Sequence, residues 1–143
     1  MSIKSFLKQI NHTPHAKKLG LQLVTAEGCT ITLKLPFNDS IIGDPINRYI
    51  HSGAITTLVD TACGVSIFQT QNNTRAMATL DLRIDHQRPA ILGNEIFATA
   101  ECYKLTHTIA FVNVTVYEDD ITNPIATAVG TFMRSNKEFP HTE

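Results

Sequence analysis

The sequence lacks any long apolar run, and this absence limits the kinds of protein it can be. No window approaches the ~18 consecutive apolar residues of a membrane-spanning helix, and the N-terminal MSIKSFLKQI lacks the apolar core of a secretory signal. The 13 acidic and 12 basic residues leave a formal net charge of -1, and the basic residues are scattered. We therefore expect a cytoplasmic protein that binds neither nucleic acid nor a membrane.

Cysteine is also scarce, and several familiar catalytic motifs are missing. The three cysteines have no CxxC spacing, and each falls in a segment with a strand or helix pattern, so we expect small core residues at Cys29, Cys63 and Cys102. The chain contains no glycine-rich phosphate loop and no GxSxG nucleophile elbow. These absences disfavour P-loop enzymes and serine hydrolases of the α/β type.

The most informative stretch runs from His51 to Gly64 and reads HSGAITTLVDTACG. Its apolar residues share one helical face, and Ser52 is a favoured N-cap residue. The other face is a small and polar stripe of Gly53, Thr56, Thr57, Asp60, Thr61 and Gly64. A lone carboxylate on such a segment is costly unless it is paired, hydrogen-bonded or used in chemistry. Asp60 is therefore the first catalytic candidate, the alternative being a core helix whose hydroxyls satisfy it.

Shorter patterns surround this helix. Residues 5–10 predict an amphipathic turn, Thr13-Pro14 opens a short helix that ends at Gly20, and residues 36–48 predict a loop. Alternating apolar residues predict a hairpin over 21–35 and strands near 78–85, 95–103, 109–117 and 125–133, joined by tight turns that favour antiparallel neighbours. We predict one α+β domain over residues 1–143, with one long central helix wrapped by a mostly antiparallel sheet of about six strands.

Together, HSGAITTLVDTACG and the following ATLDLRIDHQRPA resemble the hotdog-fold thioesterases of the phenylacetic-acid-degradation (PaaI) type. The signature of that family has His-Gly-Gly and then an acidic residue nine positions after the His, a spacing that His51 and Asp60 keep. The resemblance implies a hotdog fold and hydrolysis of acyl-CoA thioesters to free acid and coenzyme A. It also implies a homo-oligomer, a dimer or a tetramer, with active sites between subunits.

The resemblance implies roles for individual residues near the start of the helix. The backbone N–H of Ser52 would be the oxyanion donor, although the family usually has Gly there, and the positive end of a helix suits a carbonyl oxygen that gains charge. Asp60 would be the general base or the nucleophile. Thr79 matches a Ser or Thr that orients the water or the carboxylate in some relatives. His51 and Gly53 flank the donor; we expect Gly53 to contact the substrate, and His51 either joins the site or fixes the loop.

Relatives usually place an Asn in the loop before the helix, and two residues compete for that role here. Asp44 matches the family context in Gly43-Asp44-Pro45, whereas Asn47 keeps the amide. A second carboxylate near Asp60 would disfavour its base form, whereas an amide adds no charge. We therefore predict Asn47 as the functional polar group and Asp44 as the residue that orders the turn.

Several features are less specific. Arg83, Arg88 and Arg134 are candidates for contacts with the phosphates of coenzyme A, although isolated arginines more often form simple ion pairs. His12 and His15 have a metal-like spacing, but no acidic or cysteine partner clusters nearby, so we expect neither a metal nor another cofactor. A hotdog dehydratase or hydratase and a non-catalytic acyl-CoA-binding module are the alternative functions.

Overall fold

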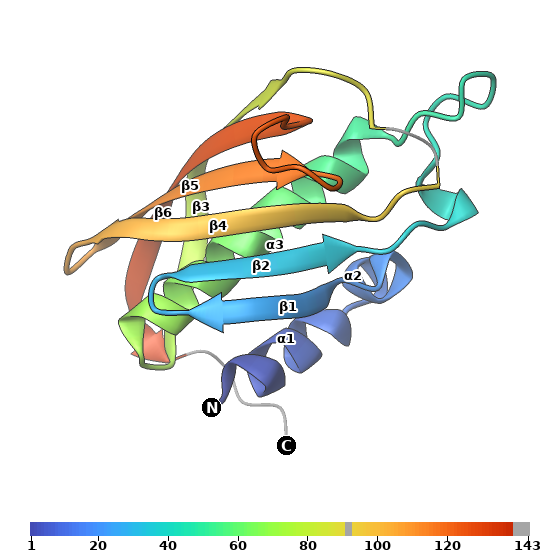
Figure 1. Cartoon of the computed structure of the whole chain (residues 1–143). Helices are drawn as coiled ribbons and strands as arrows, with labels where there is room; N and C mark the ends of the chain where they lie inside the picture. The colour runs from blue at the N-terminus through green and yellow to red at the C-terminus, as the bar shows by residue number, and fades with distance from the viewer. Residues whose placement is uncertain (91–92, 139–143) are drawn as a thin grey trace.

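The computed structural model describes residues 1–90 and 93–138, and it consists of one curved sheet and one long helix with two short helices beside it (Figure 1). The helices are α1 (Ile3–Asn11), α2 (Pro14–Leu19), the 3₁₀ helix η1 (Asp39–Ile41) and α3 (Ser52–Gln71). The strands are β1 (Gln22–Glu27), β2 (Thr30–Leu35), β3 (Arg75–His86), β4 (Ile96–Leu105), β5 (Ile109–Tyr117) and β6 (Ala126–Glu138). The predicted central helix, wrapped by an antiparallel sheet of six strands, is confirmed.

The strand order differs from a simple succession of neighbours. The sheet runs β1-β2-β4-β5-β6-β3, and all adjacent pairs are antiparallel. The expectation that tight turns join each strand to its neighbour is wrong for β3 and β4. Residues 87–95 connect these two strands, and the amides of Gln87 and Arg88 donate to Ile125 O, 2.8 and 3.3 Å away. Because β3 is last in the strand order and pairs only with β6 among the described strands, this 12-residue strand forms an edge of the sheet.

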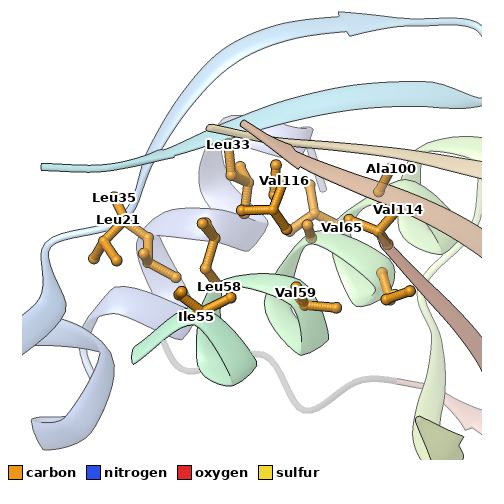
Figure 2. Packing of buried hydrophobic residues seen from close by; sticks show 14 of the residues in the cluster. Leu21, Leu33, Leu35, Ile55, Leu58, Val59, Val65, Ala100, Val114 and Val116 are labelled. Carbon is orange, nitrogen blue, oxygen red and sulfur yellow. The ribbon is translucent and has the colours of Figure 1, made fainter. Parts of the chain in front are cut away.

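One face of α3 builds the core against the sheet. Leu58, Val59 and Val65 are fully buried, and Figure 2 shows them beside Val114 and Val116 of β5. Burial of each such side chain contributes ~1.5–3 kcal/mol to stability. Asp60 lies outside this apolar face, on a side of α3 that contacts the edge strand β3.

The N-terminal helices form as their end signals predict. Pro14 is the first residue of α2 after the extended Thr13, and Gly20 ends the helix with a left-handed φ of 65°, which glycine adopts without a steric penalty. The ring of Phe6 in α1 stacks on Phe68 of α3 at a centroid distance of 4.2 Å. The N-terminal segment is thereby packed against the central helix.

The cysteines divide into two environments. Cys63 and Cys102 are buried core residues, as predicted, whereas Cys29 lies in the turn between β1 and β2 and is only partly buried. The prediction was wrong for Cys29 because the chain reverses at Gly28, which has a φ of 58°. Among the helices of the described residues, none combines the length and apolar character needed to cross a membrane.

Candidate active site

The start of α3 is capped by a histidine. Nδ1 of His51 accepts a 2.9 Å hydrogen bond from the N–H of Gly53, so His51 is the N-cap and Ser52 is the first helical residue. The expectation that Ser52 caps the helix is therefore wrong, because the imidazole supplies the acceptor one residue earlier. Since Nδ1 is an acceptor, a neutral His51 carries its proton on Nε2.

Two glycines leave the space that this histidine occupies. A Cβ at Gly43 would lie 2.7 Å from Cα of His51, and a Cβ at Gly53 would lie 2.9 Å from His51 Nδ1. The backbone N–H of His51 also donates to Ile41 O at 2.8 Å. Thus the loop before α3 closes tightly on the cap, and Gly53 acts as a partner of His51 at the helix start.

The amide of Ser52 is positioned to receive a developing negative charge. It is the first N–H of α3, and it donates no hydrogen bond to an acceptor among residues 1–90 and 93–138. Ser52 lines a depression of about 280 Å³, here named the Ser52 groove, together with Ile50, Ile55, His86, Gln87, Arg88, Pro89 and Ala90. The helix end thus offers a free donor beside a space large enough for part of a ligand.

Asp60 and Thr79 are brought together by α3 and β3. Oγ1 of Thr79 donates to Oδ1 of Asp60 at 2.7 Å, whereas no hydrogen bond to Oδ2 occurs within the described part of the chain. Between Thr79 and Asp81 the pairing of β3 with β6 shifts register, so Thr79 and Leu82 both face α3 while Leu80 is 57% exposed. The bulge therefore directs the Thr79 hydroxyl toward the carboxylate, which keeps one oxygen free for chemistry.

The two groups with catalytic potential lie far apart on the same helix. Ser52 and Asp60 are eight residues apart in α3, which places them about 12 Å apart along the helix axis. A single thioester carbonyl cannot contact the amide of Ser52 while its carbon is attacked from Asp60 of the same chain. Within one chain, the two groups therefore cannot act on the same carbonyl.

The loop before α3 contains both candidates for the family's Asn, and they contact each other. Asp44 accepts hydrogen bonds from the amides of Ile46 and Asn47 at 2.8 and 3.1 Å, and from Nδ2 of Asn47 at 2.8 Å. The Asn47 side chain and then these amides lower the pKa of Asp44. Asp44 thus orders the turn, which projects beyond the N-terminal end of α3 (Figure 1).

Two of the candidate arginines have internal partners. Arg88 donates to Glu118 at 3.1 Å and to Asn123 O at 3.0 Å, and the Glu118 side chain is only 3% exposed. Arg134 is buried and donates from Nε to Gln71 at 3.2 Å, and burial lowers its pKa. Arg88 lines the Ser52 groove, but its charge is balanced within the chain.

The third arginine lies on the other face of the sheet. Arg83 is paired across the sheet with the exposed Val129, on the face of β3 that points away from α3. Its Nε donates to Asp85 at 3.2 Å, and both side chains are exposed. Within one chain Arg83 is therefore separated from Asp60.

Known proteins are similar to this chain in sequence and in fold. The family model described as the thioesterase superfamily matches residues 47–125. The chain belongs to the thioesterase superfamily. It is 26% identical over 137 residues to the medium/long-chain acyl-CoA thioesterase YigI of Salmonella typhimurium, covering 87% of each chain. A solved Pseudomonas aeruginosa structure is 38% identical with a TM-score of 0.82, covering 93% of this chain and 99% of that one.

The PaaI protein of Escherichia coli shares the fold, with a TM-score of 0.78 and 17% identity over 96% of this chain and 99% of that one. The predicted hotdog-fold thioesterase is thereby confirmed at the level of fold and superfamily.

One pocket of this thioesterase superfamily member was missed by the sequence analysis. It is a depression of about 340 Å³ between α2, η1 and α3, here named the α2 pocket, lined by His15, Lys18, Leu19, Ser40, Ile41, His51, Gly53, Ala54 and Thr57. Nε2 of His15 lies 3.1 Å from Oγ1 of Thr57. Within residues 1–90 and 93–138, no three His, Cys, Asp or Glu side chains form a metal-binding group. No local motif joins the three segments of this pocket, which only the fold brings together.

Proposed function

We propose that this protein is a cytoplasmic homo-oligomeric enzyme that hydrolyses acyl-CoA thioesters to the free acid and coenzyme A. The observation that carries the proposal is the Asp60 carboxylate, which Thr79 holds by one oxygen, on a helix whose first amide has no partner in the described residues. The similarity to an acyl-CoA thioesterase over 87% of the chain supports the substrate class.

The chemistry follows from the amide of Ser52 and the carboxylate of Asp60. The substrate's carbonyl oxygen accepts from the N–H of Ser52, and water attacks the carbonyl carbon as its proton moves to Oδ2 of Asp60. The C–S bond then breaks and the thiolate of coenzyme A leaves. Because a thiol has a reference pKa of ~8.5, this departure needs little proton donation.

Asp60 has a second possible role, as a nucleophile. In that route Oδ2 attacks the carbonyl carbon, the thiolate leaves, and water hydrolyses the resulting anhydride. A single turnover in heavy-oxygen water can distinguish the nucleophile route from the general-base route. If water attacks the Asp60 carbon of the anhydride, the label enters the protein, whereas general-base catalysis labels only the free acid. Mass spectrometry of the peptide that contains Asp60 detects the label in the protein.

A second copy of the chain would complete each site. Ser52 and Asp60 of one chain cannot reach the same carbonyl, and β3 leaves one side of a 12-residue edge strand without a neighbouring strand among the described residues. Leu80 on this edge is 57% exposed and Ile46 in the projecting loop is 88% exposed. Long exposed edges and apolar side chains favour association. In the proposed dimer, Ser52 of one subunit faces Asp60 of the other.

The activity is tested with short-chain, long-chain and aryl acyl-CoA thioesters, with released thiol as the readout. Asp60→Asn should fold normally and lose ~10²-fold or more in kcat, because it removes the proton acceptor. Asp119→Asn, an exposed carboxylate in a turn, is the matched control. Turnover of the best substrate by Asp60→Asn within a few-fold of wild type would rule out the proposed role.

Complementation tests the shared site directly. Ser52→Pro removes the amide donor but suits the first position of a helix. Ser52→Pro and Asp60→Asn should each be inactive. When the two variants are refolded together, half of the random dimers are mixed, and each mixed dimer contains one native site and one defective site. The mixture should therefore recover about one quarter of the wild-type rate. A folded, active monomer in sedimentation, or no recovery on mixing, would reject the shared site.

A further inference from the structure

The α2 pocket combines one cation, Lys18, with an apolar floor. Leu19, Ile41 and Ala54 are buried at its base. Lys18 and His15 come from α2, and the described lining contains no Asp or Glu. Such a pocket favours a ligand with negatively charged oxygens.

Hydrogen bonds within the chain fix the orientation of both imidazoles. Oγ1 of Thr57 donates its only proton to Gly53 O at 3.0 Å, so it accepts from Nε2–H of His15. His51 accepts through Nδ1 and therefore carries a proton on Nε2 when it is neutral. The walls on both sides of the pocket thus have fixed ring orientations.

The segment that supplies Lys18 carries charge of a single sign. Residues 1–26 contain Lys4, Lys8, Lys17 and Lys18 and no Asp or Glu. None of these four ammonium groups forms an ion pair with a described residue. The charge of Lys18 at the α2 pocket is therefore not paired with a described carboxylate, and it attracts anions from solution.

The Ser52 groove differs in how its charge is balanced. Ile50, Ile55, Pro89 and Ala90 form much of its lining, and the charge of Arg88 is balanced by Glu118. Two depressions thus flank the start of α3, and they differ in that Arg88 of the Ser52 groove is paired with Glu118, whereas Lys18 of the α2 pocket has no ion-pair partner among the described residues. An acyl-CoA thioester also has two unlike arms, a phosphorylated arm on the sulfur side and an apolar arm on the acyl side.

We propose that the α2 pocket binds the phosphorylated arm of the acyl-CoA substrate, with the ammonium of Lys18 on its phosphate oxygens. The inference rests on the proposed function, because acyl-CoA supplies both arms. The thioester then lies at the start of α3, and the acyl group extends into the Ser52 groove. The pocket thereby distinguishes coenzyme A thioesters from thioesters without phosphate.

The first experiment compares kcat/KM for an acyl-CoA with kcat/KM for the same acyl group on N-acetylcysteamine, which has no phosphate. Lys18→Glu should lower this preference about tenfold, and Lys18→Gln by less, because a charged hydrogen bond to phosphate is replaced by repulsion or by a neutral contact. Lys8→Glu makes the same charge change on α1, where Lys8 lies over β1, and should keep the wild-type preference.

Equal loss of preference in Lys18→Glu and Lys8→Glu would indicate a general charge effect and overturn the proposal, as would no loss in either. Calorimetric titration with coenzyme A measures the same contact without turnover, and Lys18→Glu should weaken Kd about tenfold. Lys18-dependent binding of phosphatidylglycerol vesicles without binding of coenzyme A would also overturn the proposal, by assigning the pocket to a lipid surface. A wild type that binds coenzyme A through Lys18 yet hydrolyses no thioester would reject the proposed function and keep the pocket.

Discussion

Oγ1 of Thr79 donates a 2.7 Å hydrogen bond to Oδ1 of Asp60, and this contact joins the edge strand to the central helix. The bond selects one orientation of the carboxylate and leaves Oδ2 available. Hydrogen bonds to charged groups contribute ~1.5–3 kcal/mol. The catalytic carboxylate of the proposed mechanism therefore depends on the register of β3.

Replacement of Thr79 tests this dependence. Thr79→Val keeps the shape and removes the hydroxyl, and we expect kcat to fall on the order of tenfold with a smaller change in KM, because the carboxylate loses its fixed orientation. Thr79→Ser restores the donor and should recover most of the rate. Equal rates for the Val and Ser variants would show that the hydroxyl does not position Asp60.

A second prediction concerns the close contact between Gly43 and His51. Gly43→Ala places a Cβ 2.7 Å from Cα of His51, which belongs to the backbone and cannot rotate away. We expect a loss of ~1–3 kcal/mol in the free energy of unfolding, measured by denaturant titration. Gly28→Asn is the control, because that position has open space and Asn tolerates its left-handed φ. A Gly43→Ala protein as stable as wild type would contradict this tight packing.

The third prediction separates the roles of Asp44 and Asn47. Asn47→Ala should lower kcat/KM with little change in Tm. Asp44→Ala should lower Tm, because it removes the acceptor of the Ile46 and Asn47 hydrogen bonds. Loss of activity without loss of stability in Asp44→Ala, with an active Asn47→Ala, would reverse the assignment.

The same turn has a defined pH dependence. The pKa of folded Asp44 is lowered by its hydrogen bonds, so its contribution to stability is present above the unfolded value of ~3.9 and is lost as the pH falls through the folded pKa. Melting curves of wild type and Asp44→Asn should therefore converge in acid. A constant difference in Tm down to that range would argue against the contribution of the ionised carboxylate.

A fifth prediction concerns thiol chemistry. Burial raises the pKa of Cys63 and of Cys102, so both stay protonated and inaccessible, whereas Cys29 is partly exposed in its turn. In the native protein at mild alkaline pH, Cys29 should react quickly with a disulfide reagent and the two buried thiols only on unfolding. Cys29→Ser should abolish the fast phase. A fast phase that persists in Cys29→Ser would show that a buried thiol becomes exposed in the native state.

The helix and the strands were predictable because each carries a local pattern. The apolar face of α3 and the alternation in β4 and β5 can be read from neighbouring residues. The bulge at Leu80 was not predictable, because Ala78, Leu80 and Leu82 alternate regularly in sequence although the structure breaks that alternation. The long-range pairing of β3 with β6 decides which side chains face α3.

In the candidate site, too, the features with a local sequence pattern were predictable and those formed by distant segments were not. The segment from His51 to Gly64 predicted the start of α3 and placed Asp60 within it, and the hydroxyl of Thr79 contacts that carboxylate. The cap at His51 was missed because the acceptor is the imidazole of His51 and not the expected side chain of Ser52. The α2 pocket was missed because His15, Ser40 and Thr57 come from three segments without a shared motif.

The separation of Ser52 and Asp60 along α3 has a consequence for communication in the proposed dimer. Each helix would present its first amide to one reaction centre and its carboxylate to the other. A small axial slide of the rigid helix would then change donor distance in one centre and carboxylate distance in the other at the same time. Substrate binding at one reaction centre would alter the geometry of the other centre. A single helix would then transmit cooperativity between the two centres.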